Sequence, residues 1–391
     1  TQMNITLISN GHYPDKHAAA IRHSTLAKGL VEQGHTVTFL LLSPQEWDGK
    51  DSINYFGVAY KTLNAYTGHN KFAKNYQELK AIFKAKKILQ QQAAAKKLDA
   101  VVLFTTEPSP IYFILNAVHK MGVKVFHERT ELPYAVASQS AIRQQMLKYY
   151  LNKLLPKFDA VFVISNKLVQ YIGQYNKATK KLVTLVDLSF FKTEKQSPYS
   201  FPYIGYCGTI SGNKDGVPIL IEAFAGITSK FPSLKLVLVG NNSNKAGIKE
   251  TLDAIEKYQL QDKVIFTGLI ERDMMPVILC NAEILVVSKP DNEQNSGNFP
   301  IKIGEYLATG VPVVVTSVGE IPLFIKDGES GYLATPGSAS SFAQKMEEAL
   351  SDKEKATAAG LNGRKIAEEN FDYRKVSKVM ADYIQEIRSR K

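Results

Sequence analysis

Cysteines and long apolar runs are scarce in this 391-residue sequence. The two cysteines, Cys207 and Cys280, lie far apart inside apolar segments, so we interpret both as core thiols in a reducing compartment rather than as a disulfide or a metal-binding pair. No apolar run approaches the ~18–20 residues that span a bilayer. The N-terminal residues lead straight into a strand-like segment, and we expect no signal peptide. These absences favour a cytoplasmic protein.

Acidic residues are scarce in the first half of the chain. Residues 1–187 carry 24 Lys and Arg against 12 Asp and Glu, whereas the rest is nearly balanced, with 24 against 25. The excess concentrates in residues 71–97, where Glu78 is the only acid and apolar side chains recur at helical spacing. A second basic stretch covers residues 143–157. The pattern is typical of a solvated helix face or of a surface that docks on anionic lipid. No nucleic-acid-binding motif accompanies it, and we expect no nucleic-acid partner.

Short Val, Ile and Leu runs alternate with helical patterns along the whole chain, which predicts parallel βαβ units. Runs of this composition are typical of strands that are covered on both faces. The expected strands cover residues 5–10, 36–42, 100–106, 123–128, 160–165, 203–208, 234–240, 263–268, 282–288 and 311–316.

A polar stretch at residues 187–202 separates two such series of strands. We therefore predict two α/β domains, residues 1–187 and 188–370. Residues 371–391 are predicted as a helix that packs back on the first domain. Two doubly wound domains imply a ligand-binding cleft between the carboxyl ends of their strands.

The strongest functional signal lies in residues 295–337. A loop of Gly, Asn and Ser leads through Pro300 into a helix, whose first backbone N–H groups and dipole form an anion site. Glu305 lies one to two turns into that helix, where a carboxylate can grip paired hydroxyls. Gly310 then ends the helix, and Pro312 opens a buried strand. This arrangement suits a diphosphate that is attached to a ribose.

This stretch resembles the donor-binding signature of the retaining glycosyltransferases of family 4, which have the GT-B fold. The resemblance implies two facing Rossmann-like domains with an interdomain cleft, the first binding the acceptor and the second the nucleotide-sugar. Glu305 matches the Glu that grips the ribose hydroxyls in that family. Gly297 replaces the first Glu of the signature, which leaves Glu293, Asn295 or Asn298 as the candidate for the sugar contact. The resemblance extends the donor site to Gly297, Asn298, Phe299, Pro300, Ile301 and Lys302.

Residues 203–225 are similar to the family's phosphate-binding turn. Lys214 matches the Lys that holds the diphosphate, and we expect it to stabilise the charge of the leaving group. Thr209 replaces the family's Arg, so Arg272 or Lys302 is the candidate for a second cation. By the same resemblance, several backbone positions face the nucleotide or allow its close approach: Gly11, Gly208, Thr209, Gly240, Gly268, Leu269 and Ile270.

The segment 126–134 follows a predicted strand and is rich in ionisable groups, which favours a site. In related transferases a His near this point lies beside the donor sugar and the acceptor hydroxyl. His127 is therefore the candidate for a catalytic sugar contact, and Glu128 or Glu131 for an acceptor-side base. A salt-linked strand end is the alternative.

Three histidines, His12, His17 and His23, lie close together in the sequence, but no Cys, Asp or Glu set completes a metal site. We expect neither a metal nor another cofactor. The resemblance implies sugar transfer with retention from UDP- or GDP-sugar to the hydroxyl of a glycan or lipid-linked acceptor. The leaving diphosphate itself helps to deprotonate that hydroxyl, which agrees with the lack of a convincing carboxylate pair.

The setting implied is the synthesis of cell-surface glycan, polysaccharide or glycolipid, with the protein cytoplasmic or peripheral on the inner face of the membrane. Three alternatives stay open. A nucleotide-sugar epimerase shares this fold and would need no acceptor, and a non-catalytic nucleotide-sugar-binding protein would bind without transfer. A dinucleotide-dependent oxidoreductase would need a G-x-G-x-x-G turn after a strand, and no convincing instance exists.

Overall fold

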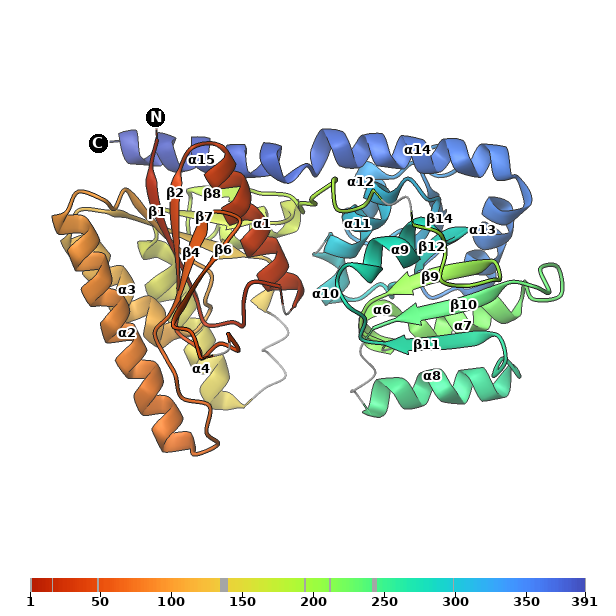
Figure 1. Ribbon diagram of the computed structural model, residues 1–391, viewed down its shortest axis with the longest axis horizontal. Helices are drawn as coiled ribbons and strands as arrows, with labels where there is room; N and C mark the ends of the chain where they lie inside the picture. Colours follow the sequence, from red (N-terminus) through yellow and green to blue (C-terminus); the bar gives the residue numbers. More distant parts are fainter. Residues whose placement is uncertain are drawn as a thin grey trace. The chain divides into compact units, whose positions relative to one another are not determined.

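The computed structural model describes residues 2–15, 17–47, 49–133, 140–192, 195–210, 212–240, 245–297 and 299–390. The chain divides into two compact units, one of Thr1–Leu185 with Tyr373–Lys391 and one of Val186–Asp372 (Figure 1). We name the two compact units unit 1 and unit 2, in that order. The predicted boundaries, at residues 187 and 370, lie close to the boundaries between these units.

Unit 1 is built on an eight-stranded sheet in the order β3-β4-β2-β1-β5-β6-β7-β8. All neighbouring strands are parallel except β3 and β4, which form an antiparallel hairpin. The strands are β1 (Asn4–Ser9), β2 (Thr36–Leu41), β3 (Ser52–Tyr55), β4 (Val58–Thr62), β5 (Ala100–Leu103), β6 (Lys124–Arg129), β7 (Ala160–Val163) and β8 (Thr179–Lys181). The sequence predicts five of these strands and misses β3, β4 and β8.

Helices cover both faces of this sheet. Ile5 and Leu7 of β1 belong to one apolar core and Ile8 belongs to the other, because successive side chains of a strand point to opposite faces. The helices are α1 (Ala18–Glu32), α2 (Lys71–Ala94), α3 (Pro108–Lys120), α4 (Ala141–Tyr149), α5 (Asn166–Ile172) and α15 (Tyr373–Ser389). A short π-helical turn, Tyr150–Leu154, and a 3-10 turn, Leu155–Lys157, follow α4.

The last helix, α15, packs on α1 within unit 1. The lack of a side chain at Gly29 lets the two helices approach, since a Cβ there would collide with Ser377. The Ser377 hydroxyl donates to the Leu26 carbonyl oxygen (3.2 Å), and the Tyr373 hydroxyl donates to the Glu32 carboxylate (2.7 Å). The C-terminal segment therefore completes the core of the N-terminal unit.

Unit 2 is built on a six-stranded parallel sheet in the order β11-β10-β9-β12-β13-β14. The strands are β9 (Tyr203–Cys207), β10 (Lys235–Val239), β11 (Val264–Gly268), β12 (Ile284–Val287), β13 (Val313–Thr316) and β14 (Tyr332–Ala334). The helices are α6 (Gly212–Asp215), α7 (Val217–Ala225), α8 (Lys245–Lys257), α9 (Met274–Cys280), α10 (Glu293–Ser296), α11 (Ile301–Thr309), α12 (Ile321–Phe324), α13 (Ala339–Ser351) and α14 (Lys353–Asn370).

Both sheets reverse their strand order once, unit 1 between β1 and β5 and unit 2 between β9 and β12. Doubly wound sheets bind ligands at such points, beyond the carboxyl ends of the strands. Among the helices of the described residues, none combines the length and the apolar composition that crossing a bilayer requires.

Candidate functional site

The predicted glycines of unit 2 meet at the ends of three neighbouring strands. Gly208 follows β9 and donates its N–H to the Val239 carbonyl oxygen of β10 (2.8 Å), while Gly240 donates to the Gly268 carbonyl oxygen at the end of β11 (3.0 Å). A Cβ on Gly240 would collide with the carbonyl oxygen of Gly208. Glycine at position 240 therefore lets β9 and β10 close up beside the switch point, and the structure brings Gly208, Gly240 and Gly268 together at these strand ends.

A buried ion cluster occupies the switch point itself. The Asp215 carboxylate is buried and lies 3.0 Å from the Lys289 ammonium and 2.5 Å from the Lys302 ammonium. The Tyr206 hydroxyl donates to the same carboxylate (2.9 Å). Burial alone would raise the pKa of Asp215, but Lys302 and then Lys289 hold that pKa well below its usual range. Two cations against one anion leave the cluster with net positive charge, which favours a bound anion.

Lys302 links this cluster to the helix that the sequence singled out. Helix α11 begins at Ile301 after Pro300, so Lys302 lies in its first turn, where free backbone N–H groups add to the positive potential. Its ammonium lies 4.9 Å from the centre of the Tyr206 ring and beside Gly208. The N-terminus of α11 and Lys302, one of the two candidates for a second cation, therefore lie beside the same buried cluster.

Phe299 and Pro300, which the resemblance placed in the donor site, are both buried. The Phe299 ring packs against Phe324 (5.1 Å between ring centres) and Phe371 (5.0 Å). These contacts fix the start of α11 from the core side. Ile301 is half-buried, Gly297 is buried, and Asn298 lies outside the described residues.

Glu305 lies one turn beyond Lys302 on α11, as predicted, and the helix ends at Gly310 in the left-handed conformation (φ 76°). As a residue Glu305 is half-buried, and burial raises the pKa of its carboxyl to about 7 against the opposing charges of Arg272 and Lys302. Among the described residues the carboxyl has no hydrogen-bond or ion-pair partner. A carboxylate in this state is available to accept hydrogen bonds from a ligand. Arg272 itself lies over the Phe190 ring (4.7 Å).

The remaining predicted residues of unit 2 follow the ends of β9 and β11. Lys214 and Thr209 are exposed. The Lys214 carbonyl oxygen accepts a hydrogen bond from the Lys289 ammonium (3.1 Å), and the Tyr206 hydroxyl shares its one proton between the Asp215 carboxylate and the Thr209 carbonyl oxygen (2.7 Å). Leu269 is 78% exposed and Ile270 half-buried.

Of the candidates for the sugar contact, Glu293 is exposed, whereas the Asn295 amide is engaged inside the protein. Asn295 accepts from Lys289 (3.0 Å) and donates to the carbonyl oxygens of Pro290 (2.9 Å) and Lys214 (3.2 Å). The sequence did not single out Asp215 or Lys289. The position of Lys289 directly after the apolar β12 run is the signal that could have identified it.

Comparison with known proteins agrees with this geometry. Residues 22–186 match the family model described as Glycosyltransferase Family 4, and residues 201–352 match the model described as Glycosyl transferases group 1. The two matches together span most of the chain. This chain belongs to the family 4, group 1 glycosyltransferases.

Individual relatives of this glycosyltransferase chain are distant. It is 31% identical to the capsular polysaccharide biosynthesis glycosyltransferase CapM of Staphylococcus aureus over 168 residues, which are 43% of this chain and 42% of CapM. It is 22% identical to the alpha-monoglucosyldiacylglycerol synthase of Streptococcus pneumoniae over 85% of this chain and 75% of that protein. The first curated relatives are thus matched over only about two fifths of their length.

Among solved structures, Anabaena Alr3699/HepE in complex with UDP-glucose matches with a TM-score of 0.72 at 18% identity, over 98% of this chain and all of that one. This likeness assigns the GT-B fold, two Rossmann-like α/β domains. The predicted interdomain cleft stays a prediction.

The predicted catalytic His127 of this glycosyltransferase does not lie at an open surface. Its ring is fully buried; Nδ1 donates to the Leu103 carbonyl oxygen (2.8 Å), and Nε2 accepts from the Tyr150 hydroxyl (2.7 Å). Burial lowers the pKa of His127 to about 4, so the ring is neutral. Both nitrogens are already occupied, which corrects the expected sugar contact: the ring ties β5 and β6 to the turn after α4.

Glu128 is likewise an internal group rather than an acceptor-side base. Its carboxylate is buried, 2.8 Å from the Arg22 guanidinium and 2.9 Å from Nε2 of His23. Burial opposes ionisation, but Arg22 and His23 hold the pKa of Glu128 at about 2. A base with so low a pKa and no access to solvent cannot take a proton from an acceptor, and the salt-linked alternative holds. Glu131, the other candidate, is exposed.

The last predicted residues of unit 1 are Gly11 and the histidines in and after the loop that follows β1. Gly11 is half-buried, and its N–H donates to the Ser9 hydroxyl (3.3 Å). His23 bonds Tyr13 and Glu128, and His17 caps α1 by accepting from the Ala20 N–H (3.1 Å). No group of three or more His, Cys, Asp or Glu side chains in the described part of the chain is placed to hold a metal ion.

Proposed function

We propose that this chain transfers a sugar from a nucleoside-diphosphate donor to an acceptor hydroxyl, with retention and without a metal, in polysaccharide or glycolipid synthesis. The observation that carries the proposal is the pairing of Lys302 and Glu305 on one helix. Three residues apart, they share a face of α11, with the cation nearer the N-terminus. A diphosphate at the first turn places its ribose hydroxyls near the carboxylate one turn deeper.

The net positive charge of the cluster of Asp215, Lys289 and Lys302 favours departure of the diphosphate from the sugar. Negative charge develops on the diphosphate as the sugar leaves, and preorganised cations in a partly buried site stabilise it. Lys302 is held in place by Asp215, whereas Lys214 is exposed and available to the ligand. In the proposed reaction the departing oxygen takes the proton of the incoming hydroxyl, and no protein nucleophile is needed.

Similar proteins of known structure or name support our proposal for the donor and the acceptor. A solved structure of the same fold contains UDP-glucose, which supports UDP as the nucleotide, and GDP is the alternative. Leu269 and Ile270 directly follow β11 and are our candidates for main-chain contacts to the base. The relatives named for capsular polysaccharide and for a glucosyl lipid support a glycan or lipid-linked acceptor.

We also propose a peripheral contact with the inner face of the cytoplasmic membrane. Helix α2 carries solvent-exposed Phe72 (87%) and Tyr76 (65%) among its lysines. Its exposed Phe83 lies 5.8 Å from the exposed Phe113 ring of α3, between ring centres. Aromatic side chains together with Lys are suited to the interface of an anionic bilayer.

The donor site is tested by thermal unfolding in the presence of UDP, GDP and their sugar conjugates. A nucleotide at a hundredfold excess over its Kd stabilises the folded protein by ~2.7 kcal/mol. Glu305→Ala should remove most of that shift, because the ribose loses a charge-assisted acceptor worth roughly 1.5–3 kcal/mol. In the parent, the shift should grow as the pH rises through about 7, where Glu305 ionises, and this growth should be missing in the variant.

Glu256→Ala on α8 is the matched control, since it removes an exposed carboxylate of the same unit. Parent-like binding by Glu305→Ala would refute the site. Donor consumption is then followed with and without acceptor glycans: conversion of the donor sugar without any acceptor would favour the epimerase alternative, and binding without any turnover the non-catalytic one.

A further inference from the structure

Lys289 is the more deeply buried of the two lysines in the ion cluster of unit 2. It lies two residues after β12, and its side chain is 5% exposed. Three oxygen atoms of the protein surround its ammonium: Oδ1 of Asp215 at 3.0 Å, Oδ1 of Asn295 at 3.0 Å and the carbonyl oxygen of Lys214 at 3.1 Å. An ammonium carries three protons. With three oxygen atoms of the protein around it, Lys289 is not placed to bind a ligand itself.

The turn after α6 holds the Asp215 carboxylate against Lys289. Gly216 has positive φ (65°), and a Cβ there would collide with the carbonyl oxygen of Ser288. The Ser288 hydroxyl donates to the Gly216 carbonyl oxygen (2.8 Å), and the Thr316 hydroxyl of β13 donates to the Lys289 carbonyl oxygen (2.7 Å). The backbones on both sides of the ion pair are therefore fixed.

Asp215 is shared between two lysines that differ in their access to a ligand. The Lys302 ammonium lies 2.5 Å from Oδ2, and the Lys289 ammonium lies 3.0 Å from Oδ1. The Lys302 side chain is 17% exposed, and within the described ranges its ammonium has Asp215 as its one hydrogen-bond and ion-pair partner. Without Lys289, Asp215 and Lys302 would form a neutral pair. With Lys289 the cluster keeps one positive charge, and Lys302 presents that charge to a ligand.

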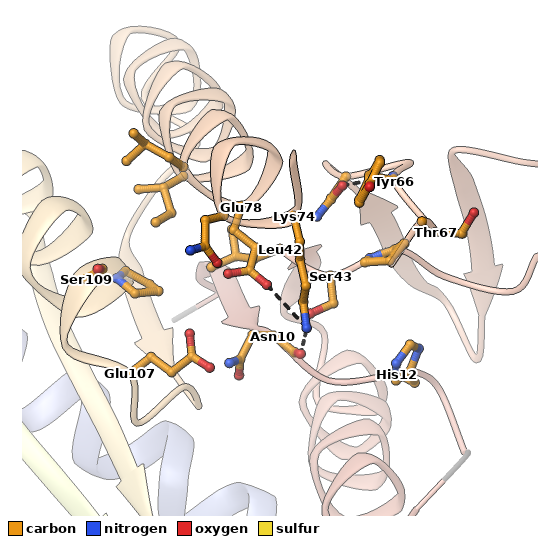
Figure 2. A pocket seen from close by; sticks show the side chains of 17 residues that line it. Asn10, His12, Leu42, Ser43, Tyr66, Thr67, Lys74, Glu78, Glu107 and Ser109 are labelled. Carbon is orange, nitrogen blue, oxygen red and sulfur yellow. Dashed lines mark hydrogen bonds and ion pairs between the residues drawn. The ribbon is translucent and has the colours of Figure 1, made fainter. Parts of the chain in front are cut away.

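The switch point of unit 1 has the opposite balance of charge. A cavity of about 690 Å³ lies there, and Figure 2 shows Lys74, Glu78 and Glu107 among the side chains that line it. Lys74 and Glu78 form an ion pair (4.0 Å). One Lys against two Glu gives the formally charged groups of this lining a net charge of −1. The ends of parallel strands are therefore not enough to attract an anion, and in unit 2 the second lysine supplies the excess positive charge.

We propose that Lys289 is a positioning residue of the donor site: by neutralising Asp215 it leaves the charge of Lys302 to the donor, and this charge sets a preference for a nucleoside diphosphate over a nucleoside monophosphate. The inference rests on the proposed sugar transfer and concerns how its donor is selected. A diphosphate carries more negative charge than a monophosphate, so the loss of one nearby positive charge weakens its binding more.

Lys289→Met tests this, because methionine is unbranched like lysine but has no charge. The diphosphate that stabilises the parent, UDP or GDP, and its monophosphate are titrated into the full chain by calorimetry. In the variant the diphosphate should bind about tenfold more weakly or worse, and the monophosphate about twofold more weakly. The preference should therefore fall at least about fivefold. Lys257→Met, at the exposed last residue of α8, also removes one positive charge from unit 2 and should keep the parental preference.

Asp215→Asn with Lys289→Met is the rescue variant. It removes the anion together with the cation that neutralises it, a change that is often tolerated for buried ion pairs, and Lys302 keeps its charge. The preference for the diphosphate should return to within about twofold of the parent. If Lys289 served the structure alone, the double variant would lose the preference at least as far as the single one.

Equal binding of the two nucleotides by the parent, an unchanged preference in Lys289→Met, or no recovery in the double variant would overturn the proposal. If Lys289→Met does not fold, the double variant decides alone by the same twofold criterion. When a nucleotide binds the parent but these tests fail, only this inference falls. When no nucleotide binds the parent, the proposed function falls.

Discussion

Glu128 is a buried carboxylate whose partners give it a structural role rather than a catalytic one. Arg22 also donates to the carbonyl oxygens of Leu182 (3.0 Å) and Val183 (2.9 Å), so the ion pair ties α1 and β6 to the segment after β8. Glu128→Gln leaves the guanidinium buried without its counter-charge. We expect a loss of about 3–5 kcal/mol in the free energy of unfolding at pH 7, measured by urea titration.

The pH dependence of this loss has a definite sign. The folded-state pKa of Glu128, about 2, lies below the ordinary value of 4.5, so the ionised carboxylate stabilises the folded protein above about pH 4.5. That stabilisation fades as the pH falls toward 2, and parent and variant should converge there. Glu131→Gln, an exposed carboxylate three residues away, should unfold like the parent. A Glu128→Gln protein of parental stability that has lost only transfer activity would restore the base assignment.

At the scale of elements, the strand ends of unit 2 depend on Gly240. Its φ of 143° is rarely adopted by residues with a side chain, and a Cβ would meet the backbone of Gly208. Gly240→Ala should therefore destabilise the unit by about 3 kcal/mol and weaken nucleotide binding, because β9 and β10 must separate at the site.

Gly337→Ala is the matched control, since Gly337 also has positive φ (75°) but nothing lies within 4 Å of its Cβ position. It should cost only about 1 kcal/mol, the strain of the backbone alone, and leave nucleotide binding intact. Equal effects of the two substitutions in thermal unfolding would show that close packing at the strand ends is not what requires glycine at position 240.

At the scale of the whole molecule, we expect the protein to sediment with anionic vesicles. The reasons are the excess of Lys and Arg in residues 1–187 and the exposed aromatic side chains of α2. Phe72→Ala with Tyr76→Ala should weaken binding to phosphatidylglycerol-containing vesicles by about tenfold or more, because two apolar side chains no longer enter the interface. Added salt should weaken binding of the parent, since it screens the lysines.

The control for this prediction is Leu323→Ala with Leu361→Ala, which removes two exposed apolar side chains from unit 2. It should sediment like the parent. Equal binding of the parent to neutral phosphatidylcholine vesicles, or undiminished binding of the α2 variant, would contradict a docking surface on that helix.

Some of the architecture could be predicted because it depends on local patterns. Apolar runs such as 282–288 and 311–316 predict buried parallel strands, and β12 and β13 confirm them. The β3–β4 hairpin was missed: its strands are short and partly exposed, and Phe56 and Gly57 form the turn with positive φ at both positions. Phenylalanine is not among the residues that usually signal such a turn.

Of the candidate site, too, one part could be predicted from the sequence and the other could not. The order loop, helix, Glu305 and Gly310 is local, and the sequence alone determined it, since capping, helical spacing and a C-terminal glycine all act within a few residues. Only the tertiary structure decided which charged side chains meet. The Asp215 carboxylate forms ion pairs with Lys289 and Lys302, and Glu128 forms one with Arg22, although the partners lie far apart in the sequence. A carboxylate's role depends on the partners and the water around it, and folding sets both by bringing distant segments together.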